Sequence, residues 1–113
     1  MDIRKGTYSY LECFAYAAER SGRTEFIPLL RKLTELPEFE EALREENQVS
    51  LLAERLQTLL LLLYRALAGL GAEEGIKGLE QLSTVRCLAI RKSAEMGRKA
   101  VKEGTFDRTE KTW

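Results

Sequence analysis

The sequence predicts an all-α protein in which about five helices form antiparallel hairpins. Apolar residues recur at the three- and four-residue spacing of a helix along most of the 113-residue chain. Valine is scarce and only two prolines interrupt the chain, which also favours helices over strands. A chain of this length supports one domain with one hydrophobic core, without disulfides or a metal.

A leucine-rich stretch, residues 49–71, is the feature around which we expect the other helices to pack. Its five consecutive leucines, Leu59–Leu63, make a helix apolar on every side, as in a buried helix. We predict a helix over residues 48–70. The expected boundary residues are Asn47 or Ser50 at the start and Gly69 and Gly71 at the end. Flanking charged residues leave an apolar run far shorter than the roughly 20 residues of a membrane span.

Five further segments have helical spacing: residues 7–20, 25–36, 37–46, 72–82 and 85–102. Gly22 suits the left-handed turn after the first segment, and Pro28 and Pro37 fall in first helical turns, where proline is tolerated. Gly75 and Gly78 lie inside a predicted helix, where each costs about 1 kcal/mol relative to alanine. We therefore expect these two glycines to mark close packing against a neighbouring helix.

Spacing alone defines the expected buried faces of the first and last helices. On the first helix they are Leu11, Phe14, Ala15 and Ala18, widened by Tyr10, Cys13 and Ala17. On the last helix they are Val85, Leu88, Ala89, Met96, Ala100 and Val101, with Ser83 or Thr84 as the cap.

The chain contains an internal repeat, in which residues 14–36 align with residues 63–85 at a shift of 49 positions. The matched pairs are Ala17 and Ala66, Gly22 and Gly71, Glu25 and Glu74, Ile27 and Ile76, Leu30 and Leu79, and Leu33 and Leu82. Each unit thus has a small residue where helices approach, a glycine turn, and aliphatic residues facing inward on the second helix.

In this pattern the two units resemble HEAT-type helical-hairpin repeats of the short bacterial form. The shared features are a helix, a glycine turn, an acidic helix start and the spacing I-x-x-L-x-x-L. Residues 84–86, with Ala89 and Ala94, are similar to the entry into a next helix. The insertion at 37–46 accounts for a period longer than the usual ~40–47 residues. The resemblance implies an α–α superhelix that serves a larger assembly. Because two repeats are fewer than the roughly three of a stable array, a compact bundle, a fragment of a longer array and an oligomer all remain open.

We expect residues 7–103 to form the single helical domain, with flexible segments at 1–6 and 104–113. The first residues lack the apolar core of a secretory signal, so we expect a cytoplasmic location. The chain is either a whole protein or a segment of a longer one.

The sequence lacks the residues that most catalytic and metal sites require. It has no histidine, the commonest general base and metal ligand. The glycines between residues 69 and 78 follow no strand, so helix packing is favoured over phosphate binding. Glu12, Glu19 and Glu54 could line a two-metal site, but such sites normally use Glu-x-x-His pairs. We therefore predict a non-enzymatic protein with no catalytic residues, no metal and no cofactor.

The two cysteines, Cys13 and Cys87, lie within apolar helical patterns. A disulfide or redox pair is one interpretation. Two small buried side chains in a reducing compartment is the interpretation that we favour.

Charge is balanced overall, 18 basic against 18 acidic residues, but it is unevenly distributed. Residues 35–46 carry six glutamates and one arginine, a net of −5, whereas residues 85–102 carry six cations and one glutamate, a net of +5. The candidate basic binding face is Arg91, Lys92, Arg98, Lys99 and Lys102. It could bind phosphate or an acidic partner, be solvated, or pair with the acidic segment within one molecule or across a dimer.

Four central leucines, Leu59, Leu60, Leu61 and Leu62, point in four directions around the predicted helix. We expect so few helices to leave some of these leucines uncovered, and we therefore predict an apolar interface there and a homodimer. The aromatic residues near the first helix, Tyr8, Tyr10, Phe14 and Tyr16, are assigned to core or interface packing rather than to base stacking.

These observations favour a non-enzymatic protein–protein interaction or structural module, as a helical-repeat domain. Two alternatives remain open: binding of nucleic acid or an acidic partner through the basic last helix, and an accessory domain of a multidomain enzyme such as an oxidoreductase. The overall charge balance disfavours nucleic acid.

Overall fold

The computed structural model describes residues 7–102, and this part of the chain is helical with no strand. Its α-helices are α1 (Thr7–Ser21), α2 (Ile27–Thr34), α3 (Pro37–Leu43), α4 (Leu51–Gly69), α5 (Glu73–Leu82) and α6 (Leu88–Lys102). Two 3-10 turns, η1 (Thr24–Phe26) and η2 (Glu45–Asn47), lie between them. The all-α prediction is confirmed, with six α-helices in place of about five. The predicted end segments, 1–6 and 104–113, lie outside the described residues.

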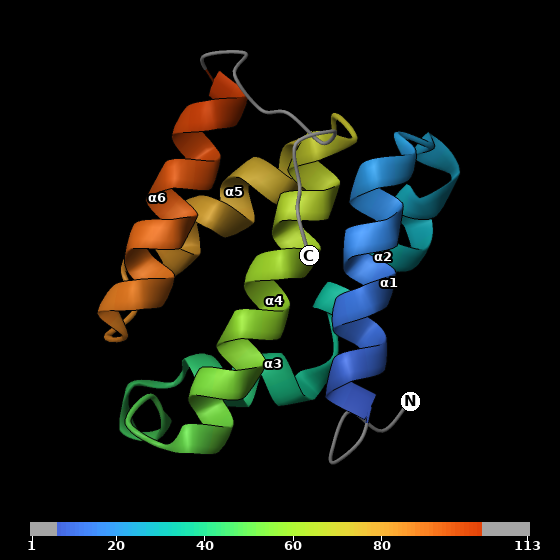
Figure 1. Cartoon of the computed structure of the whole chain (residues 1–113). Coiled ribbons are helices and arrows are strands. Elements are labelled where there is room, and N and C mark those ends of the chain that lie inside the picture. Colours follow the sequence, from blue (N-terminus) through green and yellow to red (C-terminus); the bar gives the residue numbers. More distant parts are fainter. Residues whose placement is uncertain (1–6, 103–113) are drawn as a thin grey trace.

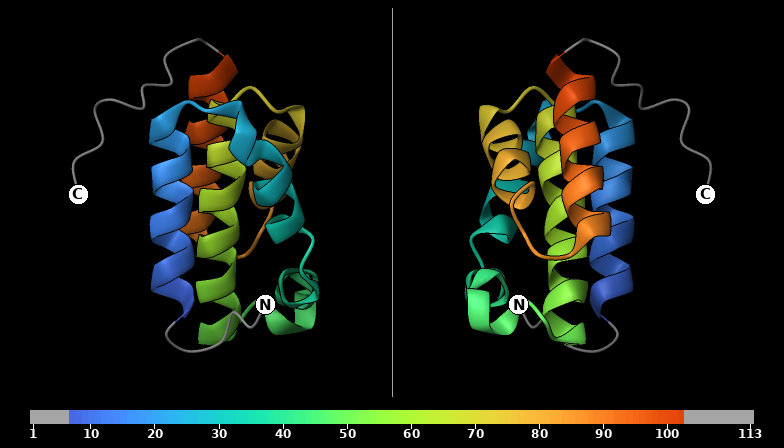
Figure 2. Two further views of the ribbon diagram at one scale, coloured as in Figure 1. Left: turned by 90° about the vertical axis from the view of Figure 1, so that its right-hand side faces the viewer. Right: turned by 90° about the vertical axis from the view of Figure 1, so that its left-hand side faces the viewer.

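The helices form two layers (Figures 1 and 2). Helices α1, α4 and α6 run in the same direction side by side, with α4 in the middle. Helices α2 and α5 return in the opposite direction behind them, and α3 crosses one end of the molecule. Each α1–α2 and α4–α5 pair is therefore an antiparallel helical hairpin.

Helix α4 is the centre of the core, as the leucine stretch predicts. Leu59, Leu60 and Leu63 are fully buried, and α4 packs against α1, α2, α3, α5 and α6. The helix begins at Leu51 rather than at residue 48 because Ser50 caps it: the Ser50 hydroxyl accepts a hydrogen bond from the Ala53 backbone N–H at 3.0 Å. In the described part of the chain, no helix has the length and apolar content to cross a membrane.

The first helix buries a narrower face than its sequence predicts. Leu11, Ala15 and Ala18 are buried, as expected, but Tyr10 is 72% exposed and Cys13 and Ala17 also face solvent. The reason is position: α1 lies at the edge of its layer and is covered mainly by α4, so only one side of it is buried.

The last helix buries only part of its predicted face: Val85 is 3% exposed and Val101 packs against the core, whereas Ala89 is exposed. Its buried residues are Ile90, Ala94 and Gly97, whereas Leu88 is 51% and Met96 is 71% exposed. Both faces of α6 carry apolar residues, and the glycine and alanine of the buried face let it approach α4 and α5 closely. The expected cap is also wrong, because Ser83 and Thr84 remain in a turn and the helix begins at Leu88.

The predicted close approach at the α5 glycines is confirmed. A methyl group on Gly75 would lie 2.6 Å from the Tyr64 carbonyl oxygen and 2.7 Å from the Ala68 Cα, and one on Gly78 would overlap the Tyr64 ring. The backbone of α5 therefore rests directly on α4. Burial in this contact raises the pKa of the Tyr64 phenol above its ordinary value.

Candidate interaction surface

The prediction of an apolar interface on the four central leucines is corrected by the structure, because three of these side chains are buried and the fourth is half-buried. Leu59, Leu60 and Leu61 are 0%, 1% and 6% exposed, and Leu62 is half-buried against the core. Five neighbouring helices cover α4, which is more cover than the sequence alone indicated. These leucines are therefore core residues of a single chain and offer no surface to a partner.

Exposed apolar side chains gather instead near the beginnings of α4 and α6. Val49, Leu51 and Leu52 are 73%, 85% and 54% exposed, and Leu88 begins α6. The Gln48 side chain connects the two places, because its Nε2 donates to the Leu43 carbonyl at 2.7 Å and its Oε1 accepts from the Arg86 N–H at 2.9 Å. The loop before α6 is thereby held against the segment before α4.

Three of the five predicted cations lie on the solvent side of α6, and the other two lie at the border with the core. Arg91 and Arg98 are half-buried at its edge, and Lys92, Lys99 and Lys102 are exposed. The structure thus places the predicted cations at solvent-accessible positions, and their role in binding stays a prediction.

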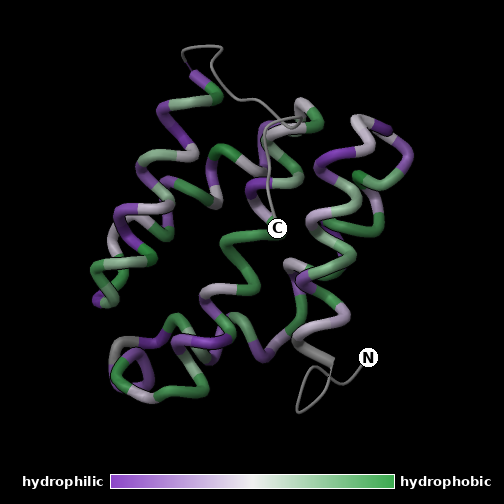
Figure 3. Tube along the Cα trace, viewed as in Figure 1, coloured by the Kyte–Doolittle hydropathy of each residue, from purple (hydrophilic) through white to green (hydrophobic). Residues whose placement is uncertain are grey.

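Within this side of α6, one row of residues combines both kinds of side chain. Leu88, Lys92, Met96 and Lys99 follow i, i+4, i+8 and i+11 spacing, so they lie along one stripe of the helix surface, which we call the outer stripe. Along α6, hydrophilic and hydrophobic residues alternate, whereas the middle of α4 is continuously hydrophobic (Figure 3). Because Leu88, Met96, Lys92 and Lys99 are all exposed, the outer stripe combines apolar area with positive charge.

Within the part of the chain that the structure describes, few carboxylates pair with these cations. Arg98 lies 3.9 Å from Glu80 of α5, and no other carboxylate of residues 7–102 lies within 4.0 Å of the remaining four cations. Lys99 and Lys102 sit in the last turn of α6, where cations stabilise the helix dipole. That structural role does not extend to Arg91 or Lys92. An open surface depression is lined by Arg98, Lys99 and Lys102 together with Glu95.

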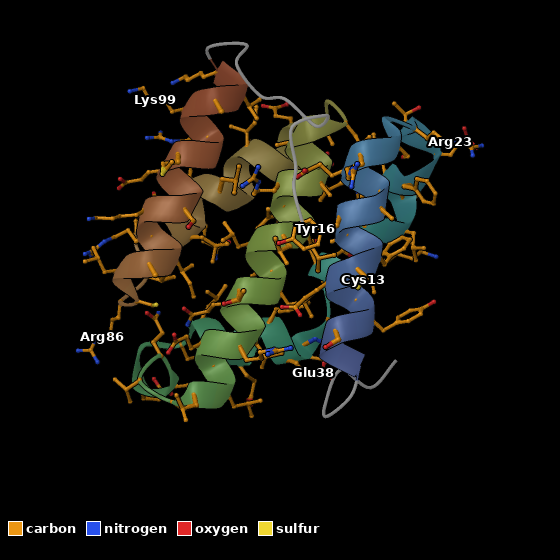
Figure 4. The ribbon with its side chains drawn as sticks, viewed as in Figure 1. Cys13, Tyr16, Arg23, Glu38, Arg86 and Lys99 are labelled. Carbon is orange, nitrogen blue, oxygen red and sulfur yellow. The ribbon has the colours of Figure 1, made fainter. Side chains whose placement is uncertain are left out.

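The acidic segment, residues 35–46, does not cover the basic face. Figure 4 places Glu38 of α3 near one end of the molecule and Lys99 near the other. Within the segment, Arg44 lies 3.9 Å from Glu41, and Glu35, Glu40 and Glu46 are exposed. Both charged faces are therefore presented to solvent.

Two of the three glutamates considered as metal ligands form ion pairs with arginines instead. Glu12 pairs with Arg55 at 3.2 Å and Glu19 with Arg65 at 3.6 Å, and both pairs join α1 to α4. Glu54 is exposed at the start of α4. Among residues 7–102, no cluster of three potential ligands could hold a metal ion.

The cysteines are free thiols at separate places in the fold. Cys87 is half-buried before α6, but Cys13 is exposed on α1, contrary to the expected burial of both.

The aromatic residues near the first helix have distinct roles. Phe14 and Phe26 make an edge-to-face contact with ring centroids 5.8 Å apart, while Tyr10 points to solvent.

The outer stripe and the exposed start of α4 are the surfaces that the sequence pattern did not indicate. A signal for the second was present, because Ser50 as the cap places Val49 before the helix and Leu51 in its first turn. For α6, periodicity supports two apolar faces, and only packing selects between them.

Comparisons with protein-family models, with curated proteins and with solved structures found no match to this chain.

Proposed function

We propose that this chain is a non-enzymatic, cytoplasmic helical-repeat module that binds a protein partner through the outer stripe of α6. The observation that supports this proposal is the interleaving of exposed Leu88 and Met96 with Lys92 and Lys99 on a helix at the edge of the fold. Apolar side chains supply buried area in a complex, and the cations orient an acidic partner. Methionine is suited to such a surface because its flexible thioether adapts to different contours.

The repeat supports the same proposal. The equivalent helices of the two units, α1 and α4, are parallel neighbours, and the two turn glycines both have positive φ, 68° at Gly22 and 92° at Gly71. In helical-repeat proteins such stacking creates extended surfaces for binding other proteins. Helix α6 then occupies the position of a third parallel helix, with its outer side open.

Nucleic acid is the competing partner, and the five cations of the basic face favour it. Binding to single strands relies on aromatic stacking platforms beside the cations, and α6 contains no aromatic residue. Phosphate contacts also do not explain why the apolar side chains of Leu88 and Met96 are exposed. A protein surface uses both components of the stripe.

Photo-cross-linking in the cells of origin tests the proposal. A photoreactive phenylalanine analogue replaces Met96 in one variant and Lys77 of α5, whose side chain is 74% exposed, in a matched control. We expect a discrete protein adduct from position 96 that is absent from position 77. Combining the first variant with Lys92→Glu and Lys99→Glu should abolish the adduct. No adduct, or the same adducts from both positions, would overturn the proposal.

A mobility-shift assay separates the competing partner. Phosphate contacts are strongest at low salt, so the absence of a shift with duplex DNA or single-stranded RNA at low salt excludes nucleic acid. A shift that is lost on Lys92→Glu and Lys99→Glu would replace the protein proposal.

A further inference from the structure

We infer that the partner of the outer stripe is a second copy of this chain, which docks the exposed acidic segment and the apolar start of α4 onto α6. This inference rests on the function proposed above and names the partner of the same surface. In the proposed contact, the basic face of one chain binds the acidic segment of the other.

Opposite charges of equal size stand on two separate faces. The net of −5 over residues 35–46 matches the net of +5 over residues 85–102. Within the molecule, Glu38 of the acidic segment and Lys99 of the basic face lie near opposite ends of the fold. The Gln48 bonds bring the end of the acidic segment next to Arg86, which is not part of the basic face. Between two chains, complementary patches steer the encounter and fix its register.

The apolar side chains match in the same way. Leu51 and Val49 are the most exposed large apolar residues of the described chain, at 85% and 73%, and they follow directly after the acidic segment. Leu88 and Met96 stand among the cations. Each face therefore has apolar area next to charge, and docking one on the other covers apolar surface while pairing charge.

The folded chain holds the acidic segment in place for this contact. The Gln57 Nε2 donates to the Ala42 carbonyl at 3.0 Å, and the Asn47 Nδ2 donates to the Glu41 carbonyl at 2.9 Å. With the Gln48 bonds, these contacts fix the backbone of α3 and η2. A preformed surface loses less conformational entropy on binding than a flexible one.

Because every chain carries both faces, the contact can be made twice. If two chains exchange the contact reciprocally, the interface is closed and the product is a two-fold dimer. If the geometry does not close, the same contact gives head-to-tail chains, and the species observed in solution decides between the two.

A charge-exchange experiment tests the inference on the full chain. The basic-face variant carries Lys92→Glu and Lys99→Glu, and the acidic-segment variant carries Glu40→Lys and Glu41→Lys. A control with Lys32→Glu and Lys77→Glu changes the net charge as the basic-face variant does, but at exposed positions on α2 and α5. Sedimentation velocity over a concentration series measures self-association, and circular dichroism confirms that each variant retains its helices.

We expect the wild type and the control to self-associate and each variant alone to associate at least about tenfold more weakly. In each variant the net charge of one segment falls from 5 to 1 in magnitude, and the two reversed side chains face charges of their own sign. An equimolar mixture of the two variants should recover association, since both contacts between unlike variants become complementary. A wild type that sediments as a monomer at every concentration, or variants that associate like the wild type, would overturn the inference.

Two measurements keep the test independent of how the variants fold. Self-association of the wild type should weaken as the salt concentration increases, because salt screens charge pairs. An association constant that does not change with salt would contradict charge pairing. The adduct at position 96 distinguishes the two proposals: an adduct of the chain with itself supports both, an adduct with a different protein retains the proposed function and overturns self-association, and no adduct overturns both.

Discussion

Residues 14–36 and residues 63–85 each contain the end of one helix, a glycine turn and a second helix. The turns are equivalent, because Gly22 and Gly71 both adopt the left-handed conformation. The inward leucines are equivalent too: Leu30 and Leu79 are both 0% exposed.

The two units differ in how the second helix meets the first. In the second unit, Gly75 and Gly78 let the backbone of α5 rest on α4. The positions 49 residues earlier hold Phe26 and Leu29 in place of glycines. Phe26 instead packs on Phe14 by its ring edge, and α2 makes most of its contacts with α4.

This difference shows that a repeated local pattern need not give a repeated interface. The turn and the inward face depend on a few local residues. The distance between two helices depends on the side chain at the crossing point, and that is where the units diverge. Four substitutions and one titration would break or sharpen this comparison.

Replacing Gly75 by alanine should have the largest effect. The added methyl group meets backbone atoms of Tyr64 and Ala68, which cannot rotate away, so α5 must move off α4. We expect the free energy of unfolding to fall by about 3 kcal/mol. Urea denaturation measures the change, and a loss below about 1 kcal/mol would show that the close contact is not needed.

Gly78→Ala should destabilise less, by about 2 kcal/mol, because it meets the Tyr64 ring rather than backbone. The ring can be removed, which allows a double-mutant cycle with Tyr64→Ala. We expect the double variant to be more stable than the sum of the single losses predicts. Strict additivity would show that the ring is not what Gly78 accommodates.

Phe26→Ala tests the first unit at the position equivalent to Gly75. We expect a loss of about 2 kcal/mol, less than for a fully buried phenylalanine, because the ring is only partly covered. Leu29→Ala is the matched control, since Leu29 is 45% exposed and should lose much less. A tolerated Phe26→Ala would mean that the edge-to-face contact with Phe14 does not hold the unit together.

Alkaline pH should weaken the contact between α4 and α5. The pKa of Tyr64 is raised by burial, so the unfolded chain loses this proton first, near the ordinary value of 10.0. Stability is then unaffected by Tyr64 below pH 10 and declines as the pH rises from there through the folded-state pKa. Tyr64→Phe should reduce this decline in a series of denaturation curves at increasing pH, and an unchanged decline would contradict the role of Tyr64.

Gly97→Ala should have the smallest effect and the opposite sign. A methyl group there would lie 3.6 Å from the nearest atoms of Arg65 and Leu79, which is an ordinary contact. Alanine also favours the helix, so we expect a gain of up to about 1 kcal/mol. A lower midpoint of thermal or urea unfolding would show that the added methyl group does not fit between α6 and its neighbours.

Much of the fold could be predicted because its signals are local. Five adjacent leucines make a helix that can exist only in a core, Ser50 offers the capping oxygen, and Gly22 and Gly71 tolerate positive φ. The close contact at Gly75 and Gly78 could also be expected, since unfavourable glycines inside a helix need a packing reason.

The candidate surface could be predicted only in part. The five cations of α6 follow from sequence spacing, but the apolar residues that accompany them were assigned to the core. Leu88 and Met96 lie on one side of the helix and Ile90 and Ala94 on another, and both sets have helical periodicity. Burial depends on which side meets α4 and α5, and a single helix contains no information about that choice.

The sequence by itself therefore determined the helices, their turns, the central place of the leucine stretch and the separation of charge. Only the tertiary structure decided that Leu59, Leu60 and Leu61 are buried within one chain. It also decided that α6 turns Met96 outward and that the acidic segment does not cover the outer stripe. The physical reason is that helix formation and capping are set by neighbours in the chain. Burial and exposure are set by contacts between segments far apart in sequence, such as α4 with α1 and α6.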